Sequence, residues 1–211
     1  MTDDELVELM RRMADAGEYR DYYYGRPDPA DPPQPGRLPD GSIDLPALRQ
    51  WRRQRKRPML YTRGTPAYEH ARDHDLIDPL PRLQPATVAA IAETERQLDV
   101  RLPPLLRRLY LEVGDGGFGP NAGIFGMGST SGSDTLVNIN LPLIEDTDPI
   151  ALWPTGVLEI LDWGCNIYTL IDCRTADGWI WEADFNRMET AARTSMTLAT
   201  WLTSWADGTM L

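Results

Sequence analysis

Seven prolines between residues 27 and 46 restrict how this 211-residue chain can fold. Proline fixes φ and has no backbone N–H, so a segment this rich in it cannot form the interior of a helix or a strand. We therefore expect an extended linker, or an arm that lies along a domain surface. The length fits one large domain, or one domain with an appendage, with the regular elements on either side of the prolines.

Residues 2–16 have the apolar spacing of an amphipathic helix. Leu6 and Met10 fall on one stripe, and acidic side chains surround it. Thr2 and Glu5 have the spacing of a capping box, in which each side chain accepts a hydrogen bond from the other residue's backbone. Such a stripe packs into a core more often than it docks on a partner, and we favour core packing.

The segment RQWRRQRKR at residues 49–57 carries six basic residues. Taken alone, it is typical of a nucleic-acid-binding patch. Acidic and apolar sequence follows it, however, and no alternation of aromatic and basic residues extends it. We favour a solvated helix face. The alternative is association with the acidic second half of the same chain or of another copy. No nucleic-acid partner is expected.

The charge is distributed unevenly along the chain. Residues 1–109 balance 18 acidic against 18 basic side chains, whereas residues 110–211 hold 14 acidic and only 3 basic ones. The net charge of -11 therefore lies in the second half. A field of that sign repels nucleic acid and anionic membranes and attracts basic partners. Simple solubility is the alternative explanation.

The chain has no run of apolar residues long enough to span a membrane. Its acidic start lacks the layout of a signal peptide, so we expect a cytoplasmic protein with no membrane partner. Two cysteines, Cys165 and Cys173, are too few for a disulfide framework, and no histidine lies near them in sequence. We expect both to be small buried hydrophobic residues.

The second half alternates helix and strand signals. Helices are predicted at 85–98, from the Leu102-Pro103 step to about Val113, and at 198–205 with Thr197 or Ser195 as its cap. The Asp115-Gly116-Gly117 turn ends the second of them. Strands are predicted at Leu136–Asn140, Gly156–Leu161, Asn166–Ile171 and Trp179–Glu182, with a hairpin turn at Asp177-Gly178. This pattern predicts an α+β fold with a mostly antiparallel sheet flanked by helices.

Motifs that would carry chemistry are weak. Residues 114–119 match G-x-G-x-x-G, but a helix precedes them where a dinucleotide-binding motif needs a strand. His70 and His74 lack the further ligands of a zinc site. Residues 145–148 could bind a divalent cation, yet they lack the glycine and distal glutamate of a calcium loop, and an acidic loop for a basic partner is equally supported. We expect no enzyme activity, no cofactor and no metal.

Several of these features occur together in one family. They are Ile91, Glu95, Leu98, the Leu102-Pro103 step and the Asp115-Gly116-Gly117 turn, followed by Ile160–Asp172, Gly178–Trp181 and Thr197–Trp205. The pattern resembles the SUKH superfamily, which includes fungal cell-wall-assembly regulators of the Smi–Knr type and many bacterial immunity proteins. Asp115 stands where the family has asparagine, and both residues tolerate such a turn. The resemblance implies a SUKH-like domain at 83–211 and an N-terminal extension at 1–80.

The resemblance also implies a function. It implies a non-catalytic protein-binding domain, an immunity protein that neutralises a cognate bacterial toxin by binding it. The alternative is a regulatory or scaffolding protein of the cell-wall type. The acidic second half suits a basic toxin domain, and we expect a monomer when no partner is bound. The candidate interface has Trp153 and Trp163 as anchors, and a rim of Glu145, Asp146, Asp148, Glu182 and Asp184.

Overall fold

The computed structural model describes residues 1–26, 38, 42, 44–54, 59–78, 80–127, 135–145, 153–187 and 191–210. The chain forms two compact units, which we describe separately. The main unit comprises Met1–Asp21 and Leu80–Leu211, and the inserted unit comprises Tyr22–Pro79. The proline-rich arm predicted at 27–46 lies mostly outside the described residues.

The first helix, α1 (Asp3–Ala16), belongs to the core of the main unit. The Thr2 hydroxyl accepts a hydrogen bond from the Glu5 N–H at 3.3 Å, and the Glu5 carboxylate accepts one from the Thr2 N–H at 2.7 Å. This confirms the predicted capping box. Leu6 and Met10 are completely buried in the main core, so the stripe packs against the fold as predicted.

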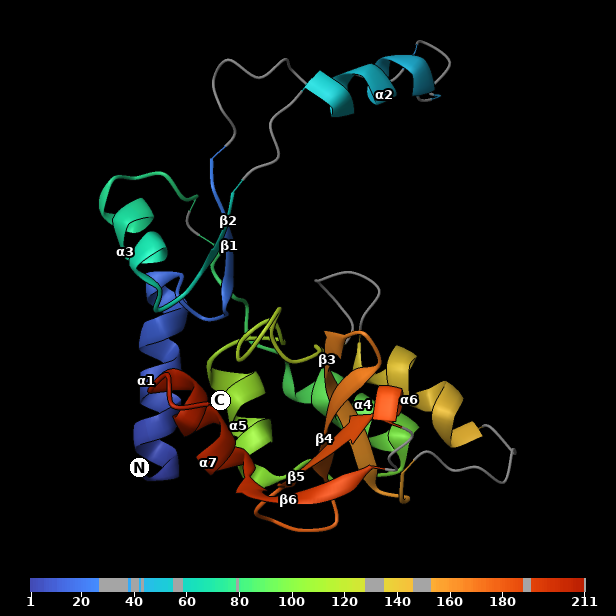
Figure 1. Ribbon diagram of the computed structural model, residues 1–211. Helices are drawn as coiled ribbons and strands as arrows, with labels where there is room; N and C mark the ends of the chain where they lie inside the picture. The colour runs from blue at the N-terminus through green and yellow to red at the C-terminus, as the bar shows by residue number, and fades with distance from the viewer. Residues whose placement is uncertain are drawn as a thin grey trace. The chain divides into compact units, whose positions relative to one another are not determined.

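Residues 1–21 therefore group with the second half of the chain, whereas the sequence had placed residues 1–80 in a single extension. In Figure 1, α1 lies beside α5 (Pro104–Glu112) and α7 (Leu198–Ala206), and its apolar stripe meets theirs. Burial of that stripe explains the grouping, because an amphipathic helix of this kind needs a partner to cover its apolar face. The segment that stands apart is the inserted unit.

The two helices of the family pattern are present. Helix α4 (Val88–Leu98) begins at Thr87, whose hydroxyl accepts a hydrogen bond from the Ala90 N–H at 3.1 Å. Helix α5 follows Pro103 and has Pro104 in its first turn, where a missing N–H costs nothing. The Leu-Pro step thus starts α5 as predicted, while α4 begins three residues later than expected.

Glu95 ties these two helices together from a buried position. Its carboxylate accepts a hydrogen bond from the backbone N–H of Leu102 at 3.0 Å. It also pairs with the guanidinium groups of Arg107 at 3.1 Å and Arg101 at 3.2 Å. The buried charge is thus matched by two cations and a backbone donor, which fixes the α4–α5 connection.

The turn after α5 depends on close approach between backbones. Gly116 and Gly123 both have positive φ, at +77° and +93°. A Cβ at Gly116 would lie 2.5 Å from the Gly126 nitrogen, and one at Gly123 would lie 2.2 Å from the Gly117 carbonyl carbon. No side chain fits at either position. This segment follows a helix and is folded back on itself, which is not the geometry of a dinucleotide-binding loop.

The main unit contains a four-stranded antiparallel sheet in the order β3-β4-β5-β6 (Figure 1). Its strands are β3 (Val157–Gly164), β4 (Ile167–Asp172), β5 (Trp179–Asp184) and β6 (Ala192–Thr197). The first three confirm the predicted strands, and β6 was not predicted. Asp177-Gly178 ends a longer β4–β5 connection over 173–178 and does not form a two-residue turn.

The sheet has two distinct faces. Leu158, Ile171 and Ile180 pack into the main core with the helices, and we call this side the helix face. Leu170 and Ala183 alternate with them and form a second, smaller cluster on the outer face. Side-chain alternation therefore assigns the residues in the regular stretches of the strands to one face or the other.

One predicted strand is wrong, because Leu136–Asn140 lies in helix α6 (Leu136–Glu145). Thr135 precedes the helix, and its hydroxyl accepts a hydrogen bond from the Asn138 N–H at 3.0 Å. Leu136 and Asn140 are both buried, and their spacing of four puts them on one face of a helix. A short run of Leu, Val and Ile does not by itself distinguish a buried helix from a strand.

Asn140 also covers the free edge of β3. Its side-chain amide donates to the carbonyl oxygen of Glu159 at 2.9 Å and accepts from the Glu159 N–H at 2.8 Å, as a neighbouring strand would. One residue further along, the Phe125 N–H donates to the Ile160 carbonyl at 2.8 Å. These contacts satisfy an edge that would otherwise be open to pairing with another chain.

The inserted unit contains four described elements. They are β1 (Tyr22–Tyr24), α2 (Leu45–Gln54), β2 (Leu60–Thr62) and α3 (Pro66–Asp73). Strands β1 and β2 pair antiparallel, and Tyr23 packs on Tyr68 of α3 with 4.8 Å between ring centroids. The basic segment 49–57 lies partly in α2, and its side chains from residue 51 onward are outside the described residues. A solvated helix face there stays a prediction.

Candidate functional site

A groove of about 710 Å³ lies in the main unit between the helix face of the sheet, α7 and the C-terminal residues. We call it the sheet groove. Strands β3 to β6, α7 and the chain end all contribute to it. Its lining is Trp163, Ile167, Glu182, Ala183, Asp184, Arg187, Ala192, Arg193, Thr194, Met196, Trp201, Thr209 and Met210.

Three large apolar side chains of the sheet groove reach solvent. Trp163 is 37% exposed, Ile167 36% and Met196 37%. They come from β3, β4 and β6, so the antiparallel sheet brings them together from distant parts of the sequence. Apolar side chains that gather in a hollow and are surrounded by polar ones mark an interaction site more often than scattered ones do.

Trp163 is held in position by a hydrogen bond. Its indole Nε1–H donates to the Thr169 hydroxyl at 2.8 Å. Thr169 on β4 lies directly opposite Glu182 on β5, and residues opposite each other in a sheet have Cβ atoms about 5 Å apart. Trp163 and Glu182 therefore share Thr169 as a neighbour on the helix face, and both line the sheet groove.

The four charged side chains of the groove differ in their partners. Asp184 pairs with Arg187 at 3.2 Å. The Arg193 guanidinium lies 5.0 Å from the ring centroid of Trp179, a cation–π contact. Glu182, by contrast, has no ion-pair partner in the part of the chain that the structure describes. Among the described residues of the sheet groove, Glu182 is thus a carboxylate without a counter-ion.

The β3–β4 turn next to Trp163 is fixed by the short 3-10 helix η1 (Phe185–Arg187), which follows β5. Cys165 and Asn166 both have positive φ, at 53° and 62°. The Asn186 side-chain amide donates to the Cys165 carbonyl, and the Phe185 N–H donates to the Asn166 carbonyl at 3.1 Å. These bonds hold the turn rigidly beside the groove, which favours a preorganised surface.

The two cysteines differ from each other. Cys165 is exposed at the β3–β4 turn, so the prediction that it is buried is wrong. The turn needs two residues of positive φ, and this puts Cys165 at its solvent-facing tip. Cys173 is half-buried against the main core, and burial together with the charge of Asp172 raises the pKa of its thiol to about 12. It remains a thiol at neutral pH and serves as packing.

The structure brings together part of the predicted interface. Trp163, Glu182 and Asp184 all line the sheet groove. Trp153 lies elsewhere, against the outer-face cluster that contains Leu170. Glu145 is the last residue of α6, with its side chain outside the description, and Asp146 and Asp148 lie outside the described residues.

Sequence reasoning missed Ile167 and Met196. The alternation of β4 could have suggested Ile167, because it lies on the same face as the buried Ile171 but at the end of the strand. No signal indicated Met196, since the β6 segment ARTSMT lacks the aliphatic run of a typical strand. Only pairing with β5 defines that strand.

Glu159 of β3 is buried beside the sheet edge, and this burial makes its carboxyl group a weaker acid. Burial, with a smaller contribution from the charge of Asp162, raises the pKa of Glu159 from 4.5 to about 7. Because the pKa of the folded state lies above that of the unfolded state, the folded protein binds the proton more tightly between these values. This group's contribution to stability is therefore complete below about pH 4.5 and is lost as the pH rises through 7.

We accordingly expect Glu159→Gln to stabilise the protein by about 1–3 kcal/mol at pH 8, because one pKa unit corresponds to about 1.4 kcal/mol. At pH 4.5 the same substitution should have little effect. Urea unfolding of both proteins at the two pH values measures the difference. A substitution effect that is equal at both pH values would contradict the buried, proton-binding role of Glu159.

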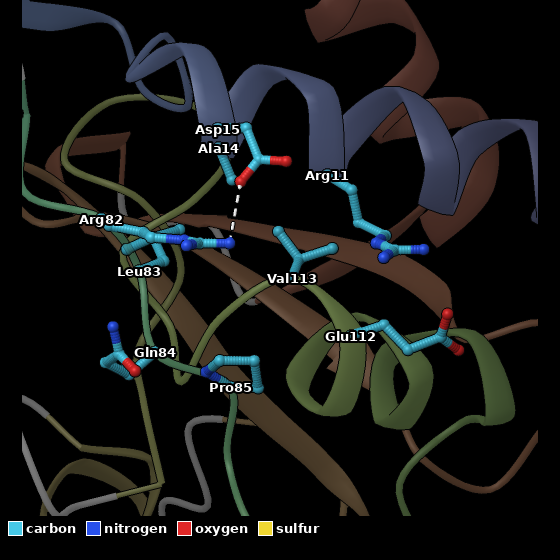
Figure 2. A pocket seen from close by; sticks show the side chains of 9 residues that line it. All are labelled: Arg11, Ala14, Asp15, Arg82, Leu83, Gln84, Pro85, Glu112 and Val113. Carbon is cyan, nitrogen blue, oxygen red and sulfur yellow. Dashed lines mark ion pairs between the residues drawn. The ribbon is translucent and has the colours of Figure 1, made fainter.

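A second pocket of the main unit has a volume of about 280 Å³ and is drawn in Figure 2. It lies between α1 and the segment 82–85. Arg82 pairs with Asp15 across it at 3.4 Å, and away from this pair Arg11 extends from α1 and Glu112 from α5 (Figure 2). Cations and carboxylates alternate around this pocket, which favours neither an anionic nor a cationic ligand.

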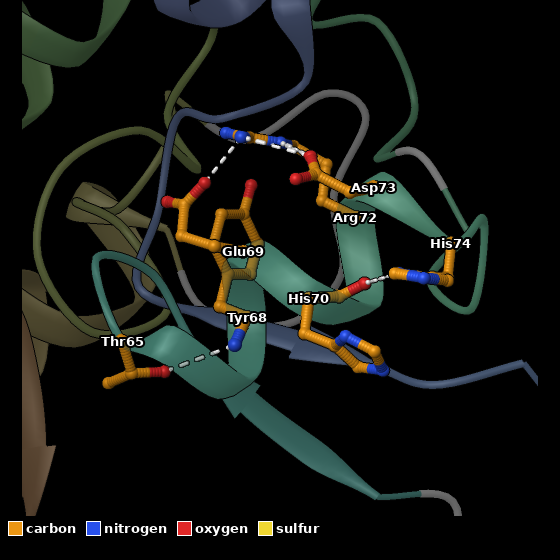
Figure 3. Close-up of polar contacts among 7 residues, drawn as sticks. All are labelled: Thr65, Tyr68, Glu69, His70, Arg72, Asp73 and His74. Atoms are coloured by element: carbon orange, nitrogen blue, oxygen red, sulfur yellow. Dashed lines mark hydrogen bonds and ion pairs between the residues drawn. The ribbon is translucent and has the colours of Figure 1, made fainter.

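The histidine pair of the inserted unit lies at the end of α3 (Figure 3). The rings of His70 and His74 are 4.1 Å apart between centroids, and the His74 Nδ1 lies 2.9 Å from the His70 carbonyl oxygen. Both side chains are exposed. Within the described ranges, no three side chains of histidine, cysteine, aspartate or glutamate are placed to hold a metal ion. The pair is a surface feature of the helix end.

Comparisons with known proteins identify the fold. No curated protein matches the chain. In the described part of the structure, no helix combines the length and the apolar character needed to cross a membrane. The family model described as "SMI1 / KNR4 family (SUKH-1)" matches residues 85–204, more than half of the chain and nearly all the elements of the main unit after α1. The chain belongs to the SMI1 / KNR4 family (SUKH-1).

Proposed function

We propose that this protein is a non-catalytic immunity protein that neutralises a cognate bacterial toxin in the cytoplasm by binding it through the sheet groove. The family is generally involved in protein–protein interactions. The observation that carries the proposal is the groove itself, where Trp163, Ile167 and Met196 form a half-exposed apolar centre beside Glu182.

The composition of the sheet groove matches the anatomy of a binding interface. Energetically dominant contacts cluster around large aromatic side chains in hollows, and polar groups surround them. Trp163 supplies the aromatic side chain, and its hydrogen bond to Thr169 limits the entropy lost on binding. The excess of carboxylates in residues 110–211 would steer a basic toxin domain toward this part of the chain.

Co-expression tests the proposal. The toxin encoded by the gene next to this one is expressed with and without the protein, and cell survival and complex formation are measured. We expect rescue of growth and a complex of the two chains in equal numbers. Absence of both rescue and complex would refute the proposal.

The groove is tested by Trp163→Ala. Truncation of a central aromatic anchor costs about 2 kcal/mol or more in binding, so we expect the dissociation constant of the toxin complex to rise at least about 30-fold. Leu143→Ala on α6 is the matched control, because Leu143 is also 37% exposed but lies outside the groove. Equal weakening by the two substitutions would exclude the groove as the interface. Thermal unfolding verifies that both variants are folded.

A cellular partner unrelated to any toxin would indicate the regulatory role instead. Removal of residues 1–80 is not a suitable test of that role, because it takes α1 out of the main core. A variant in which a short linker replaces Tyr22–Pro79 is more informative. Leu80 packs beside Gly17, so a short connection can join the remaining parts. Capture of a cellular protein that depends on the inserted unit would favour regulation over toxin binding.

A further inference from the structure

Glu182 is an exposed carboxylate in the sheet groove. The two groove arginines are engaged by other groups: Arg187 pairs with Asp184, and Arg193 stacks on Trp179. Among the described residues, none forms an ion pair with Glu182. A partner that covered this groove without supplying a cation would bury an unpaired charge, which costs several kcal/mol.

The surroundings of Glu182 suit one side chain in particular. Trp163 supplies an aromatic ring in the same groove, where it is hydrogen-bonded to Thr169, the residue opposite Glu182. Ile167 and Met196 supply apolar surface in the same groove. A carboxylate, an aromatic ring and an aliphatic surface are complementary to a guanidinium group on its three-carbon stem.

We propose that the sheet groove binds an arginine side chain of the partner, with Glu182 as its counter-ion and Trp163 as the aromatic surface on which it packs. This inference rests on the proposed function for the identity of the partner, and it defines the chemistry by which that partner is recognised. A basic toxin domain would insert the arginine, and its stem would cover Ile167 and Met196.

A peptide titration tests the arginine site without the toxin. The probe is acetyl-Gly-Arg-Gly amide, and the reference is the same peptide with citrulline, which has the shape of arginine without its charge. The Trp163 indole N–H signal, assigned with Trp163→Phe, is followed by NMR. We expect a saturable shift with the arginine peptide and at least about five-fold weaker binding of the citrulline peptide. Equal binding of the two peptides, or no saturable shift, would overturn the proposal.

Two variants test whether peptide binding needs the charge of Glu182 or only the net charge of the protein. Glu182→Gln is expected to weaken arginine-peptide binding at least about five-fold. Asp177→Asn changes the net charge equally at the opposite end of β5, outside the groove, and is expected to leave binding unchanged. Equal effects of the two variants would show a general charge effect and would overturn the role of Glu182. Unchanged thermal unfolding verifies the fold of each variant.

The toxin complex separates this inference from the proposed function. If the wild-type protein binds the toxin and Glu182→Gln weakens the complex at least about tenfold, the arginine site and the immunity function are both supported. If the wild-type protein binds and Glu182→Gln binds equally well, the arginine site is wrong and the immunity function remains. If the wild-type protein does not bind the toxin, the immunity function fails, and the peptide titration still decides the chemistry of the groove.

Discussion

Gly123→Ala is expected to destabilise the main unit by about 4 kcal/mol or more, a large part of the stability of an ordinary domain. The new Cβ would lie 2.2 Å from the Gly117 carbonyl carbon and 2.4 Å from its oxygen. Both are backbone atoms in a tight turn, so neither can move aside as a flexible side chain would. The positive φ of +93° adds strain of its own for any L-residue with a side chain.

Gly208→Ala is the matched control, because Gly208 also has a positive φ, of +69°, but has open space around it. It isolates the conformational strain, which we expect to be about 1 kcal/mol. Urea and thermal unfolding of both variants measure the difference, and Gly123→Ala should lower the melting temperature by roughly 10 °C or more. If the two variants lose similar stability, the close packing of the Gly117–Gly123 turn is not a determinant of the fold.

Glu95→Ala is expected to have the second largest effect, about 3 kcal/mol. The substitution leaves the Leu102 N–H without its acceptor in a buried position, and it leaves the guanidinium of Arg107 without its counter-ion. It also opens a small cavity between α4 and α5. Glu95→Gln should be intermediate, because an amide oxygen can still accept from Leu102 but offers no charge to the arginines.

Glu93→Ala provides the comparison on the same helix. Glu93 pairs with Arg96 at 2.6 Å, and its hydrogen bonds to Arg96 and Gln97 lower its pKa to about 2. The group is exposed, so we expect its removal to change stability little. Urea unfolding ranks the variants. A stability loss for Glu95→Ala no larger than for Glu93→Ala would show that the buried carboxylate does not hold the α4–α5 connection.

Local signals predicted most of the main unit correctly. The capping box at Thr2, the Leu102-Pro103 step and the glycine turn each depend on a few neighbouring residues, so they can be recognised in the sequence. One of the predicted strands is a helix in the structure. Leu136–Asn140 has strand-like composition, yet the buried Asn140 side chain pairs with the backbone of β3 only when the segment is helical. That contact spans nineteen residues and has no local signature.

The candidate site was predicted in part. Trp163, Glu182 and Asp184 are predicted from loop position and from side-chain chemistry that favours exposure, and the sheet brings them together. Trp153 is predicted on the same grounds, but it packs against the cluster on the outer face. Met196 joined the groove through β6, a strand that depends on pairing with β5 for its existence.

The family, the α+β class and the confinement of the negative charge to residues 110–211 can all be recognised in the amino-acid sequence, because composition, capping and turn residues act locally. Tertiary packing places α1 in the main core, makes 136–145 a helix and brings Glu182 and Trp163 into one groove. Each of these depends on contacts between segments far apart in the chain, and such contacts exist only once the core has packed.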